Sequence, residues 1–119
     1  MDRKALGQFG EDVACDYLQK HGYTILDRNF HCRLGELDIV ALHAQVLVGV
    51  EVKTRWSKAF GTPEEAVTPR KVAHMIKTLQ YYAMLHPHLP QAQRLDVVAI
   101  EVDENGHPQN IRLITNISQ

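Results

Sequence analysis

The chain has 119 residues, of which 45% are hydrophobic, and its 13 Lys and Arg side chains nearly balance 14 Asp and Glu. This length and composition predict one folded domain with a buried core and argue against wholesale disorder. The formal net charge of −1 argues against a protein that coats nucleic acid non-specifically, because such binding depends on summed positive charge.

Neither a membrane span nor a secretory signal is predicted. The apolar runs are far shorter than the roughly 20 residues that cross a bilayer, and no apolar segment follows Met1-Asp2-Arg3-Lys4. Cys15 and Cys32 make no disulfide framework, so two reduced thiols are expected. We therefore expect a cytoplasmic protein without a membrane partner.

The first half of the chain predicts one helix followed by three strands. A helix is expected from Asp2 to about His21, ended by Gly22. Its predicted apolar face consists of Leu6, Phe9, Val13 and Tyr17. The strands are predicted at residues 23–31, 35–42 and 46–54. The third has the strongest signal, because four valines alternate along one of its faces.

The second half predicts a helix and two more strands. A loop passes Trp56, and a helix then runs from about Thr68, its N-cap, to His86. Strands are expected at residues 95–102 and 111–115. The third strand, second helix and fourth strand can form a parallel crossover. The sequence thus predicts an α/β fold, with an αβββαβ core whose mixed central sheet is flanked by helices.

Charged residues on the third strand suggest a metal site. Glu51 and Lys53 point away from the valine face, and a two-residue turn at Ala44-Gln45 places Asp38 opposite Glu51, with side chains about 5 Å apart. Two such carboxylates suit Mg²⁺ or Mn²⁺, and Lys53 would position a water that attacks a phosphoryl group. Glu11, at the margin of the first helix, is a further candidate ligand.

Other interpretations of these residues remain open. Glu51 and Lys53 alone fit an ordinary solvated strand face with a salt bridge. A register slip of one residue would move Asp38 to the other face of the sheet. Glu11 alone is typical of a solvated helix position.

At these residues the sequence resembles the PD-(D/E)xK, or restriction endonuclease-like, superfamily, and more closely the YraN family of uncharacterised bacterial nuclease-like proteins. The matching segments are Gly7-x-x-Gly10-Glu11-x-x-Ala14, Gly22-Tyr23, Arg28-Asn29-Phe30, Gly35-Glu36-Leu37-Asp38, Val50-Glu51-Val52-Lys53-Thr54-Arg55, Phe60-Gly61, Lys71 and Arg94-Leu95-Asp96-Val97-Val98. Leu37 replaces the proline of the superfamily's name. Gly49 replaces a bulky aromatic residue, so a more open site floor is expected.

The resemblance implies a restriction endonuclease-like fold and a metal-dependent nuclease. By position, Asp38 and Glu51 would be metal ligands, Lys53 the catalytic lysine and Glu11 the acidic residue on the helix. Mg²⁺ or Mn²⁺ is the implied cofactor. DNA, in preference to RNA, is the expected substrate class in this interpretation, with branched or damaged structures expected. Relatives that cut junctions are commonly homodimers, although no residue here proves a dimer and the domain size permits a monomer.

Basic residues are expected to guide nucleic acid to this site. No Asp or Glu occurs between Ala66 and Leu95, and this segment contains Arg70, Lys71, Lys77 and Arg94. A local basic surface can attract phosphates even when the net charge is near zero. The nucleic-acid contacts that we predict are Arg33, Arg55, Lys58, Arg70 and Lys71.

Two questions stay open at this stage. Trp56 has two interpretations, stacking on a base or anchoring its loop onto the domain, and we favour anchoring. The protein itself has a second interpretation, a nucleic-acid-binding module with little or no turnover. A third is a protein-interaction domain in which the acidic pair belongs to a salt-bridge network.

Overall fold

The structure, a computed structural model, describes residues 2–56 and 67–117. Its elements are α1 (Arg3–Lys20), β1 (Thr24–Cys32), β2 (Gly35–His43), β3 (Val46–Trp56), α2 (Pro69–Leu85), β4 (Gln93–Val102) and β5 (Pro108–Ile114). Each predicted element is present, with ends that differ by a few residues. The chain is therefore an α/β protein that contains the predicted αβββαβ core and one added strand.

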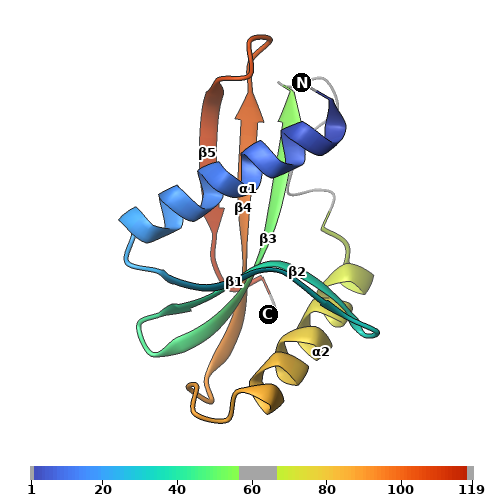
Figure 1. Ribbon diagram of the computed structural model, residues 1–119, viewed down its shortest axis with the longest axis vertical. Coiled ribbons are helices and arrows are strands. Elements are labelled where there is room, and N and C mark those ends of the chain that lie inside the picture. The colour runs from blue at the N-terminus through green and yellow to red at the C-terminus, as the bar shows by residue number, and fades with distance from the viewer. Residues whose placement is uncertain (1, 57–66, 118–119) are drawn as a thin grey trace.

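The five strands form one mixed sheet in the order β1-β2-β3-β4-β5. Strands β3 and β4 are parallel, and the other neighbours are antiparallel. A parallel pair needs a long crossover connection, which includes α2. Figure 1 shows the β1–β2 hairpin turned strongly across the direction of β3, β4 and β5. Within the described ranges, no helix is long and apolar enough to cross a membrane.

The two helices pack on opposite faces of the sheet, as the alternation along β3 predicts. Val48 and Val50 belong to the core cluster that includes α1, whereas Leu47 belongs to the cluster that includes α2. Figure 1 shows α1 lying across β3, β4 and β5, with α2 near the β1–β2 hairpin. Because residues 51 and 53 share the face of Leu47, Glu51 and Lys53 lie on the α2 side.

The buried face of α1 differs from the predicted one. Leu6 is buried, but the centre of the face is formed by Gly10, Ala14 and Leu18, while Phe9, Val13 and Tyr17 are only partly buried. A Cβ atom on Gly10 would overlap the Thr54 hydroxyl. The small residues thus let α1 approach β3 closely, which moves the larger apolar side chains to the margin.

The third strand is longer than predicted. Trp56 was expected in a loop, and that expectation is wrong: it is the last residue of β3 and pairs with Val102 of β4 in parallel register. Pairing with β4 supplies the backbone hydrogen bonds that extend the strand. The predicted loop residues Phe60 and Gly61 lie outside the described residues.

Candidate active site

The β2–β3 hairpin has the predicted register. Its turn residues Ala44 and Gln45 have φ values of 50° and 67°, as two-residue hairpin turns require. Paired residues run from His43–Val46 to Ile39–Val50. Asp38 and Glu51 are the next residues along this register, so the structure excludes the slipped pairing.

Beyond the Ile39–Val50 pair, the side chain of Asp38 links β2 to β3. Asp38 Oδ2 accepts a hydrogen bond from the Val52 backbone N–H at 2.8 Å. The neighbouring Leu37 is buried and fills the space above Gly49 together with Leu95. The expectation of a more open floor at Gly49 is therefore wrong, because leucines from β2 and β4 occupy that volume.

Glu51 is a buried carboxylate held by two ammonium groups. Its exposed fraction is 2%, and its Oε2 lies 3.2 Å from Lys53 Nζ on the same strand. The same oxygen contacts the ammonium of Lys71 from α2. Burial lowers the pKa of Lys71, but the hydrogen bond and charge of Glu51 outweigh it, so the pKa is raised overall. The chain's own cations thus compensate the Glu51 charge.

Asp38 is a carboxyl whose environment disfavours its charge. Burial, followed by the charge of Glu51, raises its pKa from 3.8 to about 7, and the hydrogen bond with Glu51 and the charge of Glu11 act in the same direction. The Val52 N–H opposes this effect by stabilising the carboxylate. A pair of close carboxyls with a strongly shifted pKa is typical of functional sites.

Glu11 lies at the edge of this pair. Arg28 Nη2 of β1 is 3.6 Å from Glu11 Oε1 and 2.8 Å from Asp12 Oδ1. Glu11 lines the same pocket as Asp38, and its charge contributes to the raised pKa of Asp38. The structure therefore places Glu11 near the pair, while Arg28 already compensates part of its charge.

The acidic pair fits a hard divalent cation. Across residues 2–56 and 67–117, no group of three or more His, Cys, Asp or Glu side chains is arranged to hold a metal ion. Asp38 and Glu51 would offer two carboxylates, and Mg²⁺ is often held by one or two carboxylates with waters and substrate phosphates completing its shell. Glu11 as a third ligand stays a prediction.

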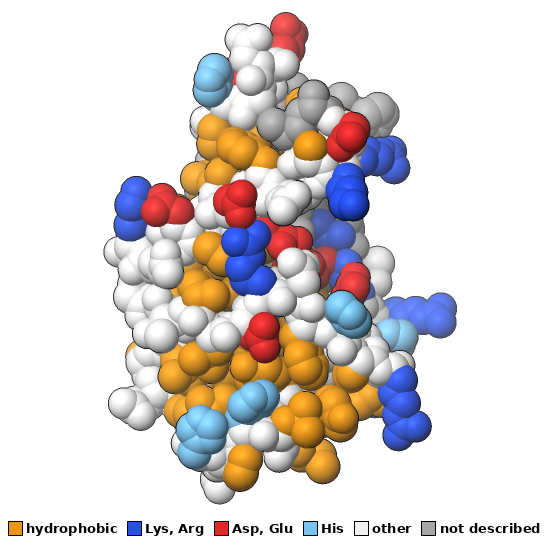
Figure 2. Space-filling model, viewed as in Figure 1, with side chains coloured by type: hydrophobic (Ala, Val, Ile, Leu, Met, Phe, Trp, Pro, Cys, Tyr) orange, Lys and Arg blue, Asp and Glu red, His pale blue; other side chains and the backbone are white. Residues whose placement is uncertain are grey.

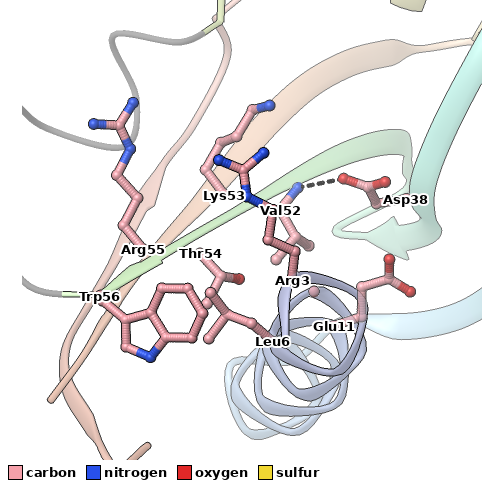
Figure 3. Close-up of a pocket in the computed structure, with 10 residues that line it drawn as sticks. Arg3, Leu6, Glu11, Asp38, Val52, Lys53, Thr54, Arg55 and Trp56 are labelled. Carbon is pink, nitrogen blue, oxygen red and sulfur yellow. Dashed lines mark hydrogen bonds between the residues drawn. The ribbon is translucent and has the colours of Figure 1, made fainter. Parts of the chain in front are cut away.

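A pocket opens between α1 and the end of β3. It encloses about 700 Å³, and it is lined by Arg3, Leu6, Gly7, Glu11, Asp38, Val52, Lys53, Thr54, Arg55 and Trp56. Figure 3 shows Asp38 and Glu11 at one end of the view and Arg55 and Trp56 at the other. The pocket therefore combines the acidic site with a basic, aromatic region.

The predicted basic contacts are dispersed. Arg55 lines the pocket and Lys71 reaches Glu51, but Arg33 lies exposed between β1 and β2, and Arg70 lies exposed in the first turn of α2. Lys58 lies outside the described residues. Figure 2 shows basic and acidic side chains interspersed on one face of the molecule. That face carries no uniform basic surface.

Two features were missed from the sequence. Arg3 and Leu6 line the pocket, but no local pattern distinguishes them from ordinary helix residues. Arg94, assigned to the basic segment, instead pairs with the fully buried Asp96, with Arg94 Nε 3.1 Å from Asp96 Oδ1. The charged Arg94-x-Asp96 pattern within an apolar strand was the available signal.

Together, the α/β fold and the carboxyl pair beside Lys53 define a mixed-sheet domain with a candidate metal site where the β2–β3 ladder ends. The chain belongs to the family described as Uncharacterised protein family UPF0102, whose model matches residues 10–100. This confirms the resemblance to the YraN family.

Relatives match along almost the whole chain. A UPF0102 protein of Caldicellulosiruptor bescii is 46% identical over 117 residues, covering 96% of this chain and 97% of the relative. One of Syntrophomonas wolfei is 48% identical over 101 residues, covering 85% and 88%. One of Clostridium botulinum is 41% identical over 117 residues, covering 98% and 95%. The family assignment therefore extends to the strands that carry the site.

Proposed function

We propose that this protein is a Mg²⁺- or Mn²⁺-dependent endonuclease that hydrolyses phosphodiester bonds in DNA, with branched or damaged structures as substrates. The observation that supports this most is the contact between Asp38 and the buried Glu51, with Lys53 only 3.2 Å from Glu51. Two carboxyls brought together against their mutual repulsion are well suited to a divalent cation.

The residues of the site have separable roles in this proposal. When bound by Asp38 and Glu51, the cation would neutralise phosphate charge and lower the pKa of a bound water. Lys53 orients the attacking water. The water oxygen forms a bond to phosphorus, a backbone P–O bond breaks, and a water proton passes to the leaving oxygen. Arg3 and Arg55, which line the same pocket, hold the flanking phosphates.

Cleavage of labelled DNA tests this function. Duplex, single-stranded, flap and four-way-junction substrates are incubated with the protein in Mn²⁺ or in EDTA. We expect cutting only with the cation, and a loss of at least ~100-fold in Asp38→Asn and Lys53→Ala, because each removes a group that acts on the reacting phosphate. Asp103→Asn, in the turn between β4 and β5, is the matched control and should cut normally. Metal-independent cutting, or full activity in Asp38→Asn, would contradict the proposal.

One observation favours a second function, a nucleic-acid-binding module with little turnover. Lys53 and Lys71 already compensate the charge of Glu51, so a cation must compete with Lys71 for this oxygen. Binding of all four DNA substrates that survives in Asp38→Asn, without cutting under any condition, would favour this module over the nuclease.

A further inference from the structure

The end of the pocket away from the carboxyls has an unusual surface. Trp56 is 41% exposed there, and the neighbouring lining residues include Leu6, Arg3 and Arg55. Figure 3 shows the indole ring beside Leu6 and on the opposite side of the view from Asp38. A large aromatic ring is thus available to a ligand in the same pocket as the proposed reaction.

The indole is carried by a well-supported part of the fold. Trp56 pairs with Val102 in the parallel ladder with β4, while the β2 ladder on the other side of β3 has ended at Ile39–Val50. The close approach of α1 at Gly10 and Thr54 supports the opposite wall of the pocket. This arrangement keeps the ring beside an open volume that a ligand can enter.

The charges around the ring favour a polyanion. Arg3 of α1 and Lys53 and Arg55 of β3 line the pocket, whereas its two acidic residues, Glu11 and Asp38, lie at the end away from Trp56 (Figure 3). A cationic groove with an aromatic ring that can stack on a base is the combination found in proteins that bind single-stranded nucleic acid. A purely apolar peptide would make no use of these cations.

The pocket relates the ring to the reacting phosphate, because Lys53 and Trp56 both line it although their side chains leave opposite faces of β3. Trp56 is three residues beyond Lys53 on β3, a separation of ~10 Å at about 3.3 Å per residue. A nucleic-acid strand that follows the pocket around the edge of β3, where the β2 ladder has ended, would place a phosphate beside Lys53 and a nearby base at the indole.

We propose that Trp56 stacks on an unpaired base close to the scissile phosphate, so that the substrate must contain single-stranded nucleotides. Bases inside a duplex have both faces covered by their neighbours and offer no free face to an indole. This inference deepens the proposed nuclease function, since it names the substrate class of the same pocket. It requires binding only, and not cleavage.

Binding without metal tests the inference separately from catalysis. Trp56 is the single tryptophan of the chain, so its fluorescence reports the pocket directly. The protein is titrated in EDTA with a short oligothymidylate, with a blunt duplex, and with a duplex carrying a single-stranded flap. We expect quenching by the oligothymidylate and the flap substrate, and much less by the blunt duplex. Equal quenching by the blunt duplex, or none with any ligand, would overturn the proposal.

Variants separate stacking from other contacts through the anisotropy of a labelled oligothymidylate. Trp56→Ala should weaken binding about 5- to 150-fold, the equivalent of ~1–3 kcal/mol per stacked base, and Trp56→Phe should restore most of it. Tyr81→Ala removes an exposed aromatic ring on α2 outside the pocket and should change nothing. Unchanged binding in Trp56→Ala with an intact circular dichroism spectrum overturns stacking. Weakened binding in Trp56→Ala supports it even if no substrate is ever cut.

Discussion

At the scale of residues, the site depends on carboxyls in an environment that opposes their charge. Asp38 and Glu51 are adjacent; Lys53 and Lys71 compensate Glu51, and the Val52 N–H compensates Asp38. Such an arrangement costs stability, and strained groups of this kind cluster at functional sites. The raised pKa of Asp38 makes this cost measurable, because it links protonation to folding.

The folded state should lose stability as Asp38 ionises. Its folded pKa of about 7 exceeds its ordinary 3.8, so the folded state holds the proton more tightly, and stability falls as the pH rises between these values. In EDTA, the free energy of unfolding of Asp38→Asn should therefore rise relative to that of the unchanged protein by ~1–3 kcal/mol between about pH 4 and pH 8. Urea unfolding at several pH values measures the difference, in which other titrating groups largely cancel.

Asp103 offers a control of opposite sign. Hydrogen bonds from the backbone N–H of His107, and then of Asn105, lower its pKa. Its contribution to folding stability is therefore present above its ordinary pKa and is lost as the pH falls. Asp103→Asn should lose stability relative to the unchanged protein as the pH rises from acid to neutral. A pH-independent difference for Asp38→Asn would contradict the assignment of Asp38 as a strained carboxyl.

At the scale of elements, the hairpin and α1 create the pocket. The two-residue turn sets the register that brings Asp38 to Glu51. Gly10 lets α1 pack directly on Thr54, which carries the next residue, Glu11, to the pocket wall. The positions of these elements were predicted from periodicity, but the close approach of α1 was not, because it depends on Thr54 from a distant segment.

Two glycines of α1 should respond in opposite ways to alanine. Gly10→Ala forces a methyl group into Thr54 and should destabilise the protein by ~1–3 kcal/mol, as overpacking does. A Cβ on Gly7 meets nothing within 4 Å, so Gly7→Ala should stabilise by ~0.5–1 kcal/mol through helix propensity. Thermal unfolding of both variants measures this. A stability change of the same sign in both variants would show that the contact between Gly10 and Thr54 does not limit the packing of α1.

At the scale of the whole molecule, a buried polar network joins segments that lie far apart in the chain. The fully buried Asp96 accepts from Tyr23 Oη at 2.7 Å, from Arg94 Nε at 3.1 Å and from the Asn116 N–H at 2.9 Å. Burial and then Asp96 raise the pKa of Tyr23 to about 12. The network connects the start of β1, the β4 strand and the segment after β5.

Removing Asp96 should therefore be costly. Asp96→Ala leaves Arg94 and Tyr23 without their shared acceptor and should destabilise by ~3–5 kcal/mol, whereas Tyr23→Phe removes a single hydroxyl and should cost ~1 kcal/mol. Urea unfolding gives both values. At temperatures where the variants stay folded, oligothymidylate binding should be unchanged, because the network does not line the pocket. A larger effect of Tyr23→Phe would contradict the central role of Asp96.

Ion pairs within the molecule explain why a net charge of −1 is compatible with a local cationic region. Three of the acidic residues are Asp38, Glu51 and Asp96. Lys53 and Lys71 form ion pairs with Glu51, and Arg94 forms one with Asp96. The near balance therefore reflects internal pairing, and it is compatible with a local cationic region at Trp56.

The sequence by itself determined the elements, the hairpin register and the meeting of Asp38 with Glu51, because periodicity and turn length are local properties that act between neighbouring strands. Only the tertiary structure decided that Lys71 pairs with Glu51, that Tyr23 joins Arg94 at Asp96, and that Trp56 lines a pocket with residues of α1. These three outcomes depend on contacts between segments far apart in the chain. Sequence patterns specify which face a residue lies on, but the packing of helices on the sheet specifies what that residue meets.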